Sequence, residues 1–406
     1  MKRIVIILLL ATISAALFAQ KNENSLRMEL GKGLNISMNN DEYIFNVGGY
    51  VQIEGLYNEI KDQQSETRFG IRRAYLNIGG VLFHNKLSFQ TRFDFTDPYP
   101  LLDAWIAYNP IKELSISVGQ RQAFSGPLSM SFDEVALAMG DRSLVDRTFF
   151  ASGRELGIFI ESRLPIGKAG LSLGAAVTSG DGRNSFGSSS SDYDLGGYKY
   201  TGRAAIYPFG FFSPGNDRTD TDFAREKSVK MVLGGTFSYN MGVSDRIGEG
   251  HGNMSLYDNM GNAAYPDYQK ISGDLMIKYS GFTFLVEYIN AIGAGLTGLY
   301  YEPQPTSQLF PKKIAEYLVL GNGLNMQLGY LLPSNWALDV RYSTVMPEWK
   351  DKIEQIEKIN SYKGSISKYF IDNRLKIQGA VTYTDFLDRQ LNNKQFIAEI
   401  GAHILF

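Results

Sequence analysis

The sequence of 406 residues contains no cysteine and only three histidines. Without cysteine, a disulfide scaffold and any metal or iron–sulfur site with thiolate ligands are excluded. His84, His251 and His403 are scattered along the chain, and nothing places them with a serine and a carboxylate as a hydrolase triad requires. We therefore expect neither an enzyme activity nor a cofactor or metal.

An excess of positive charge is also missing. The 40 Lys and Arg residues face 42 Asp and Glu residues, which gives a net charge of −2. A nucleic-acid-binding protein normally carries a basic excess, so no nucleic-acid partner is expected. With 44% hydrophobic residues, including 25 Phe and 24 Tyr, the chain is nevertheless too apolar to be disordered.

Long hydrophobic runs are absent except at the N-terminus. There the basic residues Lys2 and Arg3 precede an apolar stretch over 4–13, and the small residue Ala19 follows shortly after. This order is typical of a cleaved secretory signal peptide, which we predict over 1–19, followed by an N-terminal periplasmic segment over 20–42. No later stretch approaches the roughly 18 apolar residues of a transmembrane helix. The exported protein either stays in solution or crosses a membrane as strands.

Alternation of apolar and polar residues favours the second possibility. Over 87–95 the apolar residues and Thr91 take one face, while Ser, Gln, Arg and Asp take the other, and 114–121 and 336–342 repeat the pattern. Strict alternation indicates a β-strand with one apolar and one polar face. Sixteen such segments are predicted, at 43–58, 69–83, 87–97, 101–110, 114–122, 154–164, 170–179, 198–209, 229–240, 268–280, 282–292, 314–332, 336–346, 358–371, 374–386 and 393–406.

The connections between these segments differ in length. Short turns alternate with long loops, which we place at 123–153, 180–197, 210–228, 241–267, 293–313 and 347–357. Short turns at one rim and long loops at the other are typical of an outer-membrane barrel. We therefore predict an all-β fold: a transmembrane antiparallel β-barrel of about 16 strands over 43–406, in contact with outer-membrane lipids.

The C-terminal segment agrees with this prediction. Apolar residues from Phe396 onward share one face, and the sequence ends at Phe406. A terminal aromatic residue on an alternating strand resembles the recognition signal of the barrel assembly machinery, which we expect to act through Phe406. The expected location is the outer membrane of a Gram-negative bacterium.

Residues 123–153 form the longest connection and do not alternate. Ser131 and Glu134 have the spacing of a capping box, and a short helix is predicted after them, ending near Gly140. Two Asp–Arg pairs follow, at 141–142 and 146–147. We predict that this segment folds into the barrel as a constriction loop, whose polar candidates are Asp133, Asp141, Arg142 and Arg147. The alternative is an external loop that carries one helix.

The sequence between about 45 and 165 resembles the phosphate- and pyrophosphate-selective outer-membrane porins, the O/P porin family. The resemblance is carried by the order and spacing of five stretches: 68–76 (RFGIRRAYL), 103–108 (DAWIAY), 118–120 (VGQ), 141–143 (DRS) and 153–157 (GRELG). It implies a sixteen-stranded barrel, usually trimeric, with an infolded third loop and a lumen that conducts anions. One departure matters: the family usually carries a lysine where this sequence has Gln122, so that the basic group nearby is Arg121.

The polar faces of the predicted strands carry a mild basic excess. Arginine binds phosphate through paired hydrogen bonds, and rings of basic side chains make a pore favour anions. The pore-lining candidates for anion binding are Arg73, Arg92, Arg121, Arg163, Arg203, Lys270 and Arg341. Alternatively, these cations pair with lumen acids, for example Arg92 with Asp94 or Arg341 with Asp339, and only fill the barrel.

Three functions remain open at this point. The first is a porin, usually a homotrimer as the resemblance implies, for passive diffusion of small hydrophilic solutes, with small anions such as phosphate preferred. The second is a structural or assembly role in the outer membrane through the long loops. The third is a pore for uncharged nutrients, for which Trp105 and Tyr75 are the only inward aromatic residues that suggest a path.

Overall fold

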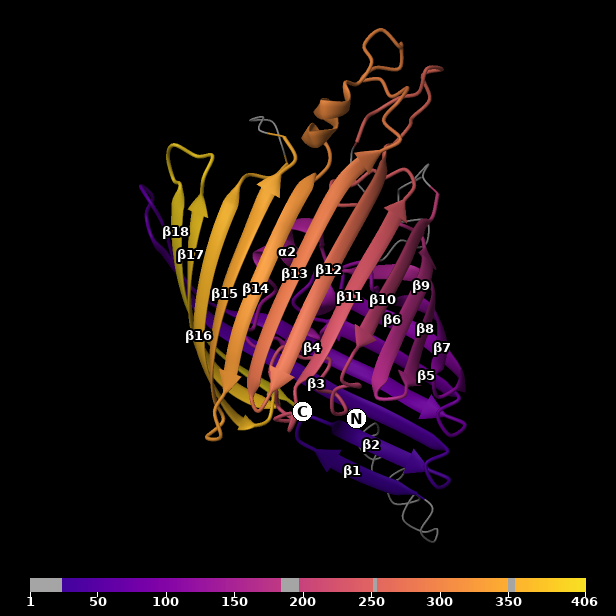
Figure 1. Ribbon diagram of the computed structural model, residues 1–406, viewed down its shortest axis with the longest axis vertical. Coiled ribbons are helices and arrows are strands. Elements are labelled where there is room, and N and C mark those ends of the chain that lie inside the picture. Colours follow the sequence, from indigo (N-terminus) through magenta and orange to yellow (C-terminus); the bar gives the residue numbers. More distant parts are fainter. Residues whose placement is uncertain (1–23, 184–196, 251–253, 350–354) are drawn as a thin grey trace, which may run out of the picture.

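The computed structural model describes residues 24–183, 197–250, 254–349 and 355–406, so the predicted signal peptide lies outside the described residues. Sixteen antiparallel strands, β3 to β18, each pair with the next, and β18 also pairs with β3, which closes a barrel (Figure 1). Their bounds are Tyr43–Ile60, Glu66–Leu82, Leu87–Asp94, Leu101–Ile111, Leu114–Gln122, Arg154–Ile166, Ala169–Thr178, Lys199–Tyr207, Lys230–Asn240, Asp267–Tyr279, Phe282–Ala294, Gly321–Leu331, Trp336–Pro347, Ile359–Ile371, Leu375–Phe386 and Lys394–Leu405. The predicted fold class is confirmed, and each predicted segment corresponds to one strand.

A hairpin that the sequence analysis did not predict precedes the barrel. Strands β1 (Ser25–Glu29) and β2 (Gly33–Met38) pair with each other, and β2 continues the sheet by pairing with the start of β3. The hairpin projects below the rim of short turns, next to the C-terminus (Figure 1). Its residues alternate as Leu34, Ile36 and Met38 against Asn35 and Ser37, so the signal for a strand was present.

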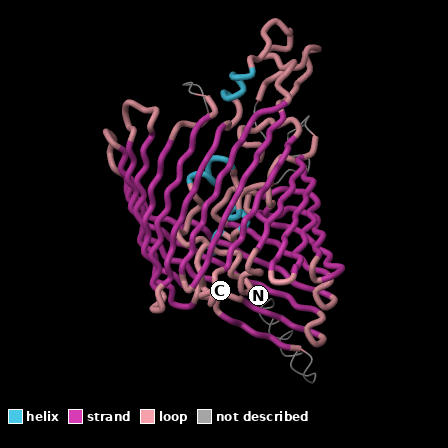
Figure 2. Tube along the Cα trace, viewed as in Figure 1, coloured by secondary structure: helices cyan, strands magenta, loops and turns pink. Residues whose placement is uncertain are grey.

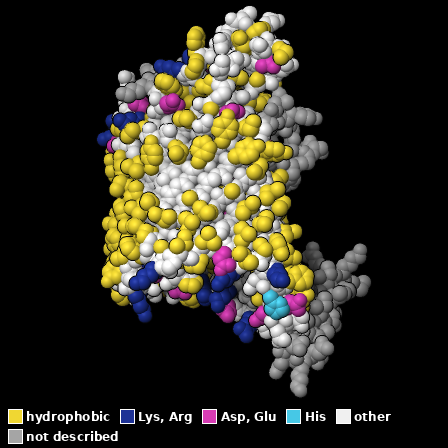
Figure 3. Space-filling model, turned by 45° about the vertical axis from the view of Figure 1, so that its right-hand side comes forward, with side chains coloured by type: hydrophobic (Ala, Val, Ile, Leu, Met, Phe, Trp, Pro, Cys, Tyr) yellow, Lys and Arg dark blue, Asp and Glu magenta, His cyan; other side chains and the backbone are white. Residues whose placement is uncertain are grey.

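The alternation in sequence becomes the two faces of the wall. The outward side chains of Ile271, Leu338 and Ile400 are more than half exposed, whereas the inward neighbours Lys270 and Asp339 are 3% exposed. Figure 3 shows hydrophobic side chains spread over the outer wall, with many of the charged side chains toward its ends. An apolar outer surface of this kind can contact lipid, and between the two ends of the wall the charged side chains of the strands face the interior.

The closing seam places the last residue against the first barrel strand. Phe406 exchanges backbone hydrogen bonds with Gly49, and its ring lies over that glycine. A Cβ atom at position 49 would approach the ring to 2.4 Å, so only glycine allows this close packing. The C-terminal aromatic residue is thus part of the barrel seam.

Long connections occur at both rims, which corrects one part of the prediction. Counted along the barrel, the connection between β10 and β11 (208–229) leaves at the same rim as the two-residue turns at 112–113 and 167–168. It folds into the barrel interior, where Thr219, Asp220 and Asp222 are buried. We call residues 208–229 the inner segment.

Helices are short and few. Two 3-10 helices, η1 (Leu128–Ser131) and η2 (Glu134–Ala136), and the helix α2 (Leu144–Phe149) belong to the predicted constriction loop. A third 3-10 helix, η3 (Pro311–Glu316), lies in the external loop before β14, where a strand was predicted from residue 314. In the described part of the chain, no helix is long and apolar enough to cross a membrane.

Candidate functional site

Residues 123–153, the constriction loop, cross the interior of the barrel (Figure 2). The Arg73 side chain on β4 donates to the carbonyl of Gly140 over 2.9 Å. Nearby on the wall, Lys376 on β17 donates to the carbonyls of 137 and 138. Farther round the barrel, Glu287 on β13 accepts from the Ser129 amide over 2.7 Å. Because strands from around the wall bind the same loop, it is fixed inside the lumen as predicted.

The helix of this loop is not where the sequence analysis placed it. Ser131 is the last residue of η1, and Glu134 opens η2 beneath the cap residue Asp133. The capping box is formed instead by Ser143 and Asp146, at the start of α2. The correction has a physical reason: Glu134 is used by two arginine side chains and is not free to reach back to position 131.

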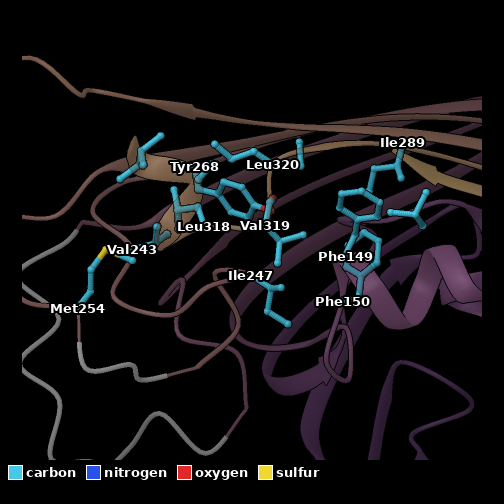
Figure 4. Close-up of a cluster of buried hydrophobic side chains, with 14 of the residues drawn as sticks. Phe149, Phe150, Val243, Ile247, Met254, Tyr268, Ile289, Leu318, Val319 and Leu320 are labelled. Carbon is cyan, nitrogen blue, oxygen red and sulfur yellow. The ribbon is translucent and has the colours of Figure 1, made fainter. Parts of the chain in front are cut away.

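Helix α2 is held by a hydrophobic core inside the outer half of the barrel. Phe149 is fully buried against inward residues of the wall and against the external loops 241–266 and 295–320. Figure 4 shows Phe149 and Phe150 beside Ile289, with Leu318 and Val319 further along the cluster. Val145 and Phe149 approach β14 at Gly323, where a Cβ would meet them at 3.0–3.1 Å. This half of the lumen is filled by protein.

Asp141 anchors the loop to strands β15 and β16. Its carboxylate lies 2.8 Å from Nη2 of Arg341 on β15 and 3.0 Å from Nζ of Lys363 on β16. Burial alone would raise the pKa of Asp141, but the charges of Arg341 and Lys363 outweigh it and hold this pKa well below its ordinary value. The carboxylate is therefore ionised throughout the physiological range.

A chain of alternating charges joins the loop to strands β5, β6 and β8. Nη1 of Arg154 lies 3.1 Å from Glu134 and its Nε lies 3.0 Å from Asp103. The chain continues from Glu134 to Arg142, over 3.2 Å, and from Asp103 to Arg92, over 3.7 Å. Arg92 ends it with a contact of 2.6 Å to Asp133. We call these six residues the charge chain.

The charge chain borders a hollow toward the long-loop rim, the outer hollow. Its volume is about 350 Å³, and Glu134, Arg142 and Arg154 of the charge chain form part of its lining. Six basic and five acidic side chains line it, with Tyr75 and Phe150 among the remaining residues. Arg147 of α2 reaches this hollow, and its exposed side chain makes no ion pair within the described residues.

A second hollow, the inner hollow, opens toward the short-turn rim. Its volume is about 440 Å³, and five basic but only three acidic side chains line it. Arg121 projects into it between Glu161, 2.6 Å away, and the rings of Trp105 and Phe159. Arg163 pairs with Asp217 of the inner segment over 2.6 Å.

The inner segment narrows the lumen from this rim. Lys278 on β12 is fully buried and donates from Nζ to the carbonyls of Asn216, Thr219 and Thr221 over 2.6–2.9 Å. Asp220 accepts from the Ala138 amide over 2.7 Å, which ties the segment to the constriction loop. Two infolded pieces of chain therefore meet in mid-barrel and leave the space on the side of β4 to β10.

The structure brings most of the predicted site residues into this region, though with other partners than expected. Arg92 and Arg341 pair with Asp133 and Asp141 of the loop, and not with acids on their own strands. Asp146 takes part in the capping box of α2, and within the described residues it forms no ion pair with Arg147. Among the described residues, the remaining lumen candidates take the partners Gln52 and Gly140 (Arg73), Asp274 (Arg203) and the Phe149 carbonyl (Lys270).

Sequence reasoning missed several residues that build the constriction. Arg154 was quoted only as part of a motif, and Glu134 only as a helix cap, although both are central to the charge chain. Lys278 stood in a lumen-facing pattern, but its role depends on the inner segment. Glu249 of the external loop 241–266 accepts from backbone amides at the end of the constriction loop. No local sequence pattern predicts this contact, because the partners are about a hundred residues apart in sequence.

Comparisons with known proteins agree with this architecture. The family model described as phosphate-selective porin O and P matches residues 45–277, more than half of the chain. No curated protein matches the sequence. Among solved structures, the chain resembles the anion-selective porin from Comamonas acidovorans, with 11% identity and a TM-score of 0.55, over 90% of this chain and 100% of that one.

Two further porin structures resemble the chain to a similar degree. OprB of Pseudomonas putida covers 90% of this chain and 94% of its own, and the DcaP channel of Acinetobacter baumannii covers 90% and 97%. Both are 10% identical with a TM-score of 0.53, so the likeness shows the fold. With the family match, these findings establish that the chain belongs to the phosphate-selective porins O and P and is a Gram-negative outer-membrane channel for small solutes.

Proposed function

We propose that the channel prefers small anions, phosphate among them, and lets them diffuse passively, without catalysis. The inner hollow carries this proposal. Each of its acids has a basic partner: Glu161 has Arg121, Asp217 has Arg163, and Glu113 lies 3.3 Å from Lys112. Arg218 remains, exposed in the hollow and without an ion pair in the described part of the chain.

The outer hollow supports the same preference. Its exposed Arg147 gives this mouth an uncommitted cation too, so that both ends of the path attract anions. Between the two mouths, acidic side chains hold three guanidinium groups in place, those of Arg92, Arg142 and Arg154. A permeating anion can replace an acidic side chain as the partner of such a guanidinium group. Several weak sites in series are what conduction requires.

Gln122 lines the inner hollow at the place of the missing lysine. Its Nε2 is buried and has no hydrogen-bond partner among the described residues. An amide donor in this place can bind an anion without adding charge, which we expect to weaken the preference for phosphate relative to a lysine.

The test is a recording of the purified protein in a planar bilayer across a KCl gradient. We expect a reversal potential on the anion side and a chloride current that inorganic phosphate reduces. Replacing both Arg147 and Arg218 with alanine should move the reversal potential toward zero. A cation-selective wild-type channel would refute the proposal.

A second candidate is a structural or assembly role through the external loops. It is favoured by one observation: the core around Phe149 and Leu318 fills the outer half of the barrel between β11 and β15. Folded and inserted protein that gives no channels would support it. Under either function we propose a cleaved signal peptide over 1–19, a periplasmic location for 20–42, a homotrimer, and recognition of Phe406 by the assembly machinery.

A further inference from the structure

Three consecutive backbone amides at the end of the constriction loop bind one oxygen atom. The amides of Ala151, Ser152 and Gly153 donate to Oε2 of Glu249 over 3.1, 3.1 and 2.9 Å. Gly153 has a φ of +67°, so the chain leaves the three amides in a left-handed conformation that favours glycine. Successive amides in such a turn form a concave site for an anion. We call these three amides the amide nest.

The occupant of the amide nest comes from a different part of the chain. Glu249 belongs to the external loop 241–266 and is 8% exposed. Only one of its carboxylate oxygens is used, because Oε1 is buried and has no hydrogen-bond partner among the described residues. The carboxylate is thus held as a terminal oxygen of phosphate or of a free carboxylate would be.

The amide nest lies on the route of a permeating solute. Ala151 and Ser152 line the outer hollow together with Arg147 and Arg154. Two of the three nest residues therefore border the hollow into which an anion is attracted, and six arginine side chains share its lining. Lys199 on β10 pairs with Glu155 on β8 at 2.6 Å, so its charge is already compensated. The nest itself offers uncharged donors.

We propose that the amide nest is an oxyanion-binding site of the channel and that Glu249 occupies it as a tethered competitor. A phosphate or carboxylate anion binds the nest when it displaces Glu249, and the external loop then loses this attachment. The inference deepens the proposed anion channel and rests on it. A tethered ligand acts at an effective concentration of roughly millimolar, so only comparable anion concentrations displace it.

The first experiment removes the competitor. Glu249→Ala should lower the concentration of inorganic phosphate that halves the chloride current by about ten-fold, because the site no longer has to be vacated. Glu249→Gln keeps a side-chain oxygen that can accept from the amides and should give a smaller change. Asp258→Ala, which removes the same charge from an exposed turn of the same loop, should leave the half-blocking concentration unchanged.

A second variant tests the amides themselves. A Cβ at Gly153 would meet Gln122 at 2.4 Å and would strain a residue of positive φ, so Gly153→Ala distorts the nest. Added to Glu249→Ala, it should abolish the gain in phosphate affinity, with insertion checked by heat-modifiable migration and by chloride conductance. Calorimetric titration of the detergent-solubilised protein with phosphate should follow the same order.

The outcomes separate this inference from the proposed function. A wild-type channel without anion preference overturns the proposed function. An anion-selective wild type in which Glu249→Ala raises chloride conductance but leaves phosphate block and phosphate binding unchanged overturns the competitor, since Glu249 then only fastens the loop. Equal phosphate affinity with and without Gly153→Ala overturns the nest as the site.

Discussion

Arg154 on β8 and Glu134 on the constriction loop meet inside the barrel, with Nη1 and Oε1 3.1 Å apart. Both side chains are more than nine-tenths buried, and each has a second ionic partner, Asp103 for the arginine and Arg142 for the glutamate. A buried charge is tolerated when such partners surround it. The pair therefore fixes where the loop lies in the lumen and places charge on the solute path.

Arg154→Met should destabilise the barrel and shift its selectivity. Asp103 and Glu134 would keep their burial and lose their shared partner, which costs about 3–5 kcal/mol. The charge chain would also become more negative by one unit, which should raise the permeability to cations. Thermal unfolding and the reversal potential in a KCl gradient measure the two effects.

The matched control is Arg183→Met, because Arg183 pairs with Asp97 at a site where both side chains are over a fifth exposed. Such a pair contributes about 1 kcal/mol or less. Equal losses of stability in the two variants would contradict the central place of Arg154.

The sequence alone predicts the wall better than the interior. Alternation predicts which side of a strand faces lipid, and each of the sixteen predicted segments corresponds to one strand of the barrel. The spacing at Ser131 and Glu134 and that at Ser143 and Asp146 are equally good capping boxes, and only the tertiary contacts of Glu134 decide between them.

The inner segment shows a similar limit. Counting strands was enough to place 208–229 at the short-turn rim, since it follows the eighth barrel strand. Its inward fold depends on Lys278 meeting three carbonyls, which no local pattern shows. Local patterns also fail to predict the partners of the lumen arginines Arg92 and Arg341, because these partners come from a loop that is distant in sequence.

Acid should release the constriction loop only below the ordinary carboxylate range. The pKa of Asp141 is lowered in the folded protein, so its ion pairs with Arg341 and Lys363 contribute fully above the unfolded value of about 3.9. This contribution is lost as the pH falls from there through the folded pKa. We expect the contribution of these ion pairs to the unfolding temperature to be constant from pH 8 to 5, and to fall steeply below about pH 4.

Asp141→Asn tests the assignment of that fall. The variant should be less stable at pH 7, and its unfolding temperature should change less between pH 5 and 3 than that of the wild type. A parallel decline of both proteins below pH 4 would show that other carboxylates cause it.

Lys278→Met should loosen the inner segment and widen the inner mouth. The methionine keeps most of the apolar stem but leaves the carbonyls of Asn216, Thr219 and Thr221 without their donor, which costs about 3 kcal/mol. Single-channel conductance should rise. Lys230→Met, which removes one exposed contact to the Phe209 carbonyl, should leave conductance unchanged, and a rise in both variants would count against a specific role of Lys278.

Arg121→Ala should lower anion selectivity, with little change in stability. Arg121 is partly exposed in the inner hollow, where its guanidinium lies over the rings of Trp105 and Phe159 and pairs with Glu161. Its loss leaves Glu161 without its ion pair on the solute path, so the local charge becomes more negative and the barrier to anions rises. The reversal potential should move toward the cation side by a measurable step, while Lys168→Ala, in the exposed turn between β8 and β9, should not move it. If Arg121→Ala keeps the wild-type reversal potential, Arg121 only fills the barrel wall, and the preference must reside in the other cations of the path, such as Arg147 and Arg218.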